Sequence, residues 1–114
     1  VDPSYYDLIL TGDLASCGSP IVVDILRQEG YDISEQHNDC GKLVFSPDQP
    51  VFAGGSGCGC CAVVTYGHIK KLLEQQRLKR VLVVATGALL NPLIVQQKET
   101  IPCIAHAVAL CSAD

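Results

Sequence analysis

The chain has 114 residues, of which 48% are hydrophobic and 18% are charged, a composition typical of one folded domain rather than a disordered segment. Its formal net charge is −4 and only 8 residues are lysine or arginine, which argues against nucleic acid or an anionic membrane surface as a partner. No signal peptide is visible, and no apolar run reaches the roughly 18 residues that a membrane span needs.

The mean hydropathy of +0.28 is high for a small domain and predicts a face that a second subunit or the rest of a longer chain covers. The first residue is valine and not methionine, which fits a fragment or a processed chain. The 7 cysteines are odd in number and include the adjacent pair Cys60 and Cys61. We therefore expect free thiols in a reducing compartment rather than a disulfide framework.

The first half of the chain predicts a strand and then a helix. The strand covers residues 6–10, and the helix covers residues 19–29 with Pro20 in its first turn. Either Asp13 or Ser16 could cap this helix. Turn-forming residues then dominate 31–50, with a short strand expected over 43–45.

The second half predicts a second helix over 59–77 and then a β-branched strand over 81–86. Because both faces of that strand are apolar, it is expected in the centre of the sheet. A last strand over 101–110 could pair with it in the antiparallel direction. This order predicts one α/β domain over residues 1–114, with a mixed sheet and a βαβαβ core flanked by helices.

A loop rich in glycine and cysteine joins the two halves. It places four glycines within residues 54–59 and three cysteines within 58–61. A helix that begins after such a loop directs N–H groups and the positive end of its dipole into it, which favours anions and thiolates. The alternative is that the glycines only permit tight turns and close helix–sheet packing.

Three loops follow strands of the predicted sheet, at 12–14, 54–60 and 86–88. The carboxyl ends of parallel strands meet at one edge, where open α/β sheets bind their ligands. We therefore predict that one concave site is lined by Asp13, Ser56, Gly57, Cys58 and Gly87.

Other motifs point to sharper chemistry but are incomplete. Cys58 and Cys61 form a C-x-x-C pair of the kind that dithiol oxidoreductases use, although the glycines before it are atypical of that loop. His37 and Cys40 are the other local pair of metal ligands, and a zinc site needs four. The glycine loop matches neither a dinucleotide-binding fingerprint nor a phosphate-binding P-loop. His68 and His106 are interpreted as packing residues. Because none of these motifs is complete, no cofactor and no metal is expected.

Six segments carry a family resemblance, and they span nearly the whole chain: residues 7–14, 31–33, 38–41, 53–60, 82–90 and 96–108. They resemble the C-terminal half of the thiolase-like fold. More closely, they resemble the C-terminal part of a family of sporulation proteins from endospore-forming bacteria. The glycine–cysteine loop and the tail from Gln96 to Val108 are the most specific of these segments.

The resemblance implies a binding protein that takes part in the uptake of dipicolinic acid into the developing spore. It implies a location at the cytoplasmic face of the spore inner membrane. The partners that it implies are other sporulation transport proteins and either an N-terminal lobe or a homodimer partner. Thiolase-like enzymes place a histidine after the first strand of this half and an asparagine or histidine near its glycine loop. The matching positions here hold Gly12-Asp13 and Ser56-Gly57, so condensation chemistry is not expected. The alternatives are a lobe of an acyl-transferring condensing enzyme or a dithiol redox protein.

Overall fold

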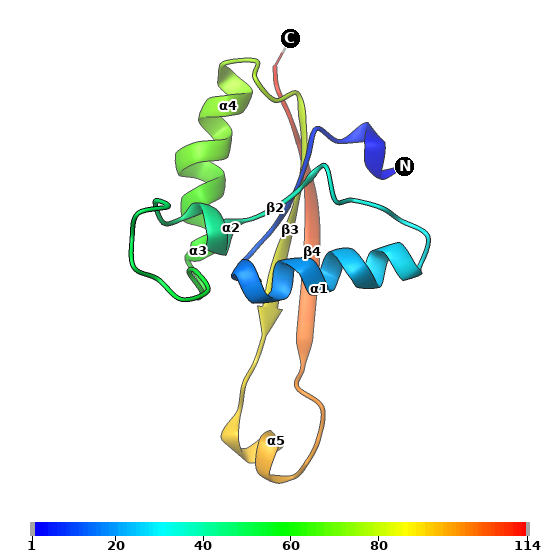
Figure 1. The fold of residues 1–114 in the computed structure, drawn as a ribbon, viewed down its shortest axis with the longest axis vertical. Helices are drawn as coiled ribbons and strands as arrows, with labels where there is room; N and C mark the ends of the chain where they lie inside the picture. Colours follow the sequence, from blue (N-terminus) through cyan, green and yellow to red (C-terminus); the bar gives the residue numbers. More distant parts are fainter. Residues whose placement is uncertain (1, 114) are drawn as a thin grey trace.

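The sheet of this α/β protein has four strands in the order β2-β1-β3-β4 (Figure 1). The computed structural model describes residues 2–113, and its strands are β1 (Leu8–Thr11), β2 (His37–Asp39), β3 (Arg80–Ala88) and β4 (Cys103–Cys111). Strand β1 runs parallel to both β2 and β3, whereas β4 is antiparallel to β3. The predicted mixed α/β sheet is thus confirmed.

Strand β3 lies in the interior of the sheet, as its apolar sequence predicts. It pairs with β1 from Val81 to Val84 and with β4 along its whole length. The cover on its two faces is unequal, because Val81 and Val83 are buried while Leu82 and Val84 are only half-buried. Beyond Ala85 the strand leaves the body of the protein and forms an extended arm with β4 (Figure 1).

Helix α1 (Ala15–Gln28) begins four residues before the predicted start at residue 19. Its cap comes from a distant part of the chain, because the Asp39 carboxylate accepts hydrogen bonds from the Leu14 and Ala15 N–H groups at 3.0 and 2.7 Å. The prediction that Asp13 or Ser16 caps the helix is therefore wrong. Pro20 lies inside the helix and not in its first turn.

The predicted strand over 43–45 is also wrong. Strand β2 comes earlier, at His37–Asp39, and a short helix α2 (Cys40–Leu43) follows it directly. The Asp39 side chain accepts a hydrogen bond from the Gly41 N–H at 2.8 Å, which begins this helical turn. Three polar residues give no apolar strand signal, so β2 is specified by its pairing with β1 and not by local propensity.

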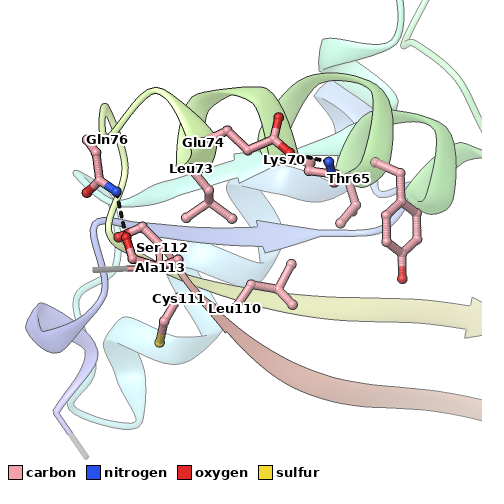
Figure 2. A pocket seen from close by; sticks show the side chains of 10 residues that line it. Thr65, Lys70, Leu73, Glu74, Gln76, Leu110, Cys111, Ser112 and Ala113 are labelled. Carbon is pink, nitrogen blue, oxygen red and sulfur yellow. Dashed lines mark hydrogen bonds and ion pairs between the residues drawn. The ribbon is translucent and has the colours of Figure 1, made fainter.

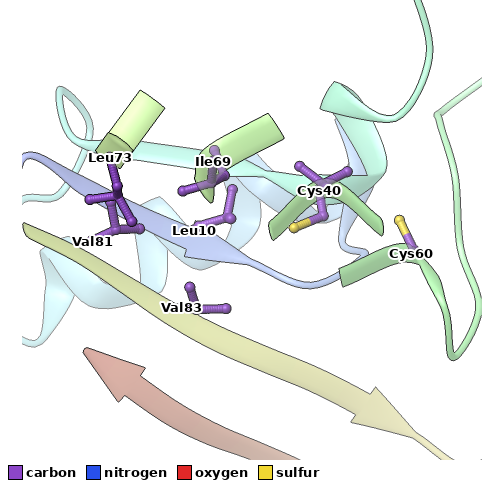
Figure 3. Packing of buried hydrophobic residues seen from close by; sticks show 8 residues of the cluster. Leu10, Cys40, Cys60, Ile69, Leu73, Val81 and Val83 are labelled. Carbon is purple, nitrogen blue, oxygen red and sulfur yellow. The ribbon is translucent and has the colours of Figure 1, made fainter. Parts of the chain in front are cut away.

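The predicted second helix is confirmed as one helical run from residue 60 to 74. It consists of α3 (Cys60–Val64), a π-helical turn η2 (Thr65–Ile69) and α4 (Lys70–Glu74). The wider π turn sets Val64 and Ile69, five residues apart, on the same side of the helix. Both belong to one buried cluster with Leu73, Leu10 and Val81. Figure 3 shows Ile69 and Leu73 of the helical run facing Leu10 and Val81 of the sheet.

Two further short helices lie at the ends of the molecule. One is the 3-10 turn η1 (Pro3–Tyr5), and the other is α5 (Pro92–Gln96) at the tip of the β3–β4 arm. The Asn91 side chain caps α5 by accepting from the Leu93 N–H at 2.9 Å. Among the helices of residues 2–113, none combines the length and the apolar character needed to cross a membrane.

Asp39 provides a test of how the fold is held together. The substitution Asp39→Ala leaves the buried N–H groups of Ala15 and Gly41, and the partly buried N–H of Leu14, without their acceptor. We expect a loss of at least about 3 kcal/mol in the free energy of unfolding, because each unpaired buried donor costs about 1–3 kcal/mol. The measurement is urea denaturation followed by circular dichroism.

The matched control is Asp48→Ala in an exposed turn, which should change the unfolding free energy by less than about 0.5 kcal/mol. Equal effects of the two substitutions would contradict the structural role assigned to Asp39.

Candidate functional site

Asp13 joins the ends of two strands to the glycine loop. Its carboxylate accepts hydrogen bonds from the Ser56 hydroxyl at 2.9 Å, the Gly57 N–H at 3.0 Å and the Thr86 hydroxyl at 3.0 Å. The backbone N–H of Asp13 also donates to the Thr86 oxygen at 3.0 Å. The strand-end loops therefore meet at one edge of the sheet, as the sequence predicts.

A hollow of about 510 Å³ opens beside this junction. Asp13, Ser56 and Gly87 all line it, and Gly57 is tied to it through the bond to Asp13. The opposite wall comes from the arm strand β4, through Cys103, Ile104 and Ala105. Sequence reasoning missed Thr86, although its position next to Gly87 at the end of β3 could have pointed to it.

Cys58 does not line this hollow. It lies in a separate hollow of about 340 Å³ that Cys61 and Thr65 also line. The predicted five-residue site is thus divided. Ser56, Gly57 and Gly87 stay together with Asp13, and Cys58 is separate from them. Ser56 and Gly57 turn toward the strand ends, whereas the next residue already leads into the helical run.

The ionisation of Asp13 reflects its hydrogen bonds. Partial burial raises the pKa of this carboxyl, but the bonds from Gly57, Ser56 and Thr86 together outweigh burial and lower the pKa below its usual value. Asp13 is therefore negatively charged at neutral pH. The three donors beside the hollow are already hydrogen-bonded to the Asp13 carboxylate, so an anion that entered the hollow would compete with Asp13 for them.

Two of the loop glycines have a packing role. A Cβ atom on Gly54 would lie 2.2 Å from the Gly41 carbonyl oxygen, and one on Gly55 would lie 2.5 Å from the Val44 side chain. The Gly55 N–H also donates to the Gly41 carbonyl at 2.7 Å. For this pair the structure supports the alternative reading of the loop, in which glycine permits close packing.

Gly57 differs from these two glycines. Its φ of 119° is one that other residues rarely adopt, yet no atom lies within 4 Å of the position its Cβ would take. Its conformation is needed to aim the N–H at Asp13, and the space beside it is open. Gly57 is thus the loop glycine best placed to let a ligand approach the backbone.

A buried polar cluster lies directly beneath this edge. The Thr11 hydroxyl donates to the Asp39 carboxylate at 2.5 Å and lies 3.0 Å from the His37 Nε2. Burial lowers the pKa of His37, while the charge of Asp39 opposes this effect. Ala15, which Asp39 binds, has a left-handed φ of 54°. Such strain persists only where several surrounding contacts fix the backbone.

The cysteines differ in how deeply they are buried. Cys40 and Cys60 are buried, and burial raises the pKa of both thiols. Cys58 is exposed, and Cys61 lies between these extremes. All seven cysteines are free. Within residues 2–113 no three histidine, cysteine or acidic side chains come together in a way that could hold a metal ion.

The hollow beside Cys58 continues into another one along the helical run. This second hollow has a volume of about 450 Å³ and separates α4 from the end of β4, with Leu73 on one side and Leu110 on the other (Figure 2). Tyr66, at the border of the two hollows, is 70% exposed. A single helical run therefore leaves the β4 side of this sheet face without cover.

The lowered pKa of Asp13 predicts a pH dependence. A group whose pKa is lower in the folded state stabilises the fold above its unfolded pKa, and this contribution is lost as the pH falls through the folded value. The stability difference between the chain and the variant Asp13→Asn should be constant from pH 5 to 8 and shrink below about pH 4. Urea denaturation across this range measures it, and a difference that does not change with pH would contradict the hydrogen-bonded carboxylate.

Comparison with known proteins places the chain in a family. The family model for Stage V sporulation protein AD matches residues 1–111. A curated relative, "Stage V sporulation protein AD" of Bacillus subtilis (strain 168), is 66% identical over 103 residues. The match covers 90% of this chain and 30% of the relative. The chain therefore belongs to the Stage V sporulation protein AD family and spans less than a third of the length of this relative.

Proposed function

We propose that the chain is the C-terminal lobe of a non-catalytic, thiolase-like sporulation protein that binds dipicolinic acid during its uptake into the developing spore. Membership of a sporulation family supports the setting. The mixed sheet and the helical run that follows the glycine loop support the thiolase-like fold. The hollow at Asp13 supports the binding function.

The convergence of hydrogen-bond donors at one strand edge carries this proposal. The Ser56 hydroxyl, the Thr86 hydroxyl and the Gly57 N–H all aim at a carboxylate, which in this structure belongs to Asp13. A planar dicarboxylate presents the same acceptor atoms and can use the same donors once the Asp13 side chain turns away. The apolar wall of Ile104 and Ala105 suits the face of an aromatic ring.

The lack of catalysis is proposed from the chemistry of the same edge. A condensing enzyme needs a donor that stabilises the developing oxyanion of a thioester. Asp13 has a lowered pKa and stays ionised at neutral pH, so it cannot donate a proton there. Ser56 is engaged in a hydrogen bond to Asp13.

The remainder of a longer polypeptide is proposed to cover the open side of the helical run. Val63 and Tyr66 are 62% and 70% exposed on it, and Tyr66 lines two hollows. An N-terminal lobe of the kind the thiolase-like fold implies would bury this face. We further propose that the assembly works in a reducing compartment, at the cytoplasmic face of the spore inner membrane, with other sporulation transport proteins and no cofactor.

Gly57 provides the test of the binding site. The change Gly57→Val places a side chain in the open space beside the donor N–H. If the loop contacts the ligand, affinity for dipicolinic acid should fall by at least about tenfold, because a blocked close approach removes a charge-assisted hydrogen bond. Calorimetric titration of this chain, and of the same chain extended toward the N-terminus, measures the affinity.

The matched control is Gly59→Val, two residues along the same loop. Gly59 also has open space around it, but its φ of −92° suits any residue. The affinity of the Gly59→Val variant for dipicolinic acid should therefore stay within about threefold of that of the parent chain. A folded Gly57→Val protein with unchanged affinity would show that the loop is structural and that the ligand binds elsewhere.

One group of side chains is also compatible with an enzyme. Cys58, Cys61 and His106 line the same hollow, and a dithiol oxidoreductase or a lobe of a condensing enzyme could use such a group. An activated Cys58 would react with maleimide at pH 6 much faster than an ordinary thiol. Cys17, which is also exposed, is the internal reference for this rate.

The binding function predicts that Cys58 and Cys17 react at rates within about threefold of each other, because neither is then activated as a thiolate. Mass spectrometry of peptides from timed samples measures both rates. A rate for Cys58 that is at least about thirtyfold higher would favour the enzymatic alternative.

A further inference from the structure

The outer edge of β4 has the features of a surface that pairs with another strand. It is the terminal strand of the sheet, and within residues 2–113 no other strand pairs with its outer side. Every residue of β4 except Leu110 is exposed, including Ile104 at 57% and Val108 at 58%. No lysine, arginine, aspartate or glutamate interrupts residues 103–111. Proteins usually shorten, charge or cover such an edge because it otherwise recruits another strand.

The hydrogen bonds at the two ends of the β3–β4 ladder show which backbone groups point outward. The Leu89 N–H donates to the Pro102 carbonyl, and the Ser112 N–H donates to the Lys79 carbonyl. Both pairs continue the register of the ladder. Because bonded and non-bonded pairs alternate in an antiparallel ladder, the even-numbered residues of β4 bond to β3. The outward N–H and carbonyl groups therefore belong to the odd-numbered residues: Cys103, Ala105, Ala107, Ala109 and Cys111.

The sequence of β4 is nearly symmetric about Ala107. Going outward from this residue in both directions, the chain places His106 against Val108 and then alanine against alanine. The next two pairs are isoleucine against leucine and cysteine against cysteine. A two-fold axis through Ala107 would set these residues opposite one another in an antiparallel pair of two β4 strands. In that register no like charges face each other, and apolar side chains meet on both sides of the centre.

The backbone and the sequence agree on this register. Pairing centred on Ala107 makes the odd-numbered residues the hydrogen-bonded pairs, and these are the residues whose N–H and carbonyl groups are directed outward. A shift by one residue would break both agreements. We propose that β4 pairs with β4 of a second copy of this chain, antiparallel and centred on Ala107, so that the two sheets become one continuous sheet.

This dimer makes a specific geometric prediction about two cysteines. Cys103 of one copy would lie opposite Cys111 of the other, as a hydrogen-bonded pair with Cα atoms about 5.5 Å apart. That separation lies within the range that a disulfide can bridge. Both thiols are free and exposed, so mild oxidation with copper phenanthroline and oxygen, which takes up the two electrons and two protons, can link them.

The test uses the single variants Cys103→Ser and Cys111→Ser. Neither variant alone can form the bond between positions 103 and 111, whereas a mixture of the two can form it once per dimer. We expect the linked peptide in the mixture and in the parent chain, and not in either variant alone, by mass spectrometry after proteolysis. A mixture that gives no such peptide would overturn the proposed pairing.

A second measurement uses the residue on the axis. The change Ala107→Lys brings two ammonium groups together across the two-fold axis, while Ala107→Ser keeps a small neutral side chain. In sedimentation equilibrium the lysine variant should raise the dimer dissociation constant at least about tenfold and the serine variant less than about threefold. A dimer that Ala107→Lys leaves unchanged would overturn the proposal. The proposal would also be overturned if the Cys103–Cys111 cross-link did not form between the two single variants of a polypeptide of the relative's full length, since the rest of the chain would then cover β4.

Discussion

The hydrogen bonds of the buried Asp39 carboxylate are the contacts on which the strand edge around Asp13 depends. It lies at the end of β2 and accepts hydrogen bonds from Thr11 at the end of β1, from the first turn of α1 and from Gly41. One side chain thus fixes the exits of two parallel strands and the start of a helix. A buried charge is tolerated only with such complete hydrogen bonding. The glycine loop then packs on Gly41, so its position also depends on this carboxylate.

A second carboxylate, Asp13, connects this base to the edge of the sheet where the hollow of about 510 Å³ opens. It bonds to the glycine loop through Ser56 and Gly57 and to β3 through Thr86. The same donors that attract Asp13 would attract a ligand carboxylate, so binding of an anion here competes with an internal contact. Under the proposed function, such competition would lower the affinity for weak anions and would favour a ligand with two acceptor groups and an apolar face.

The parts of the fold that the sequence predicts best are those with strong local patterns. The β-branched run of β3 and the apolar spacing of residues 60–74 are confirmed. The structure also brings Asp13, Ser56 and Gly57 within hydrogen-bond distance of one another. Strand β2 could not be predicted, because its residues are polar and only pairing with β1 holds them extended. The start of α1 was misplaced because its cap lies 24 residues away in sequence. Cys58 lines a separate hollow beside the helical run, and a prediction from strand ends alone does not distinguish two hollows that lie next to one loop.

The most direct test of dipicolinic acid binding in the Asp13 hollow is a titration of isotopically labelled protein with this ligand, followed by amide NMR spectra. If the Asp13 hollow binds the dicarboxylate, the amide signals of Gly57, Thr86 and Gly87 should shift together with one saturation curve. Those of Gly54 and Gly55, which pack against Gly41 and Val44, should move much less. A saturable response confined to other parts of the chain, or no response from a folded protein of full length, would contradict the account.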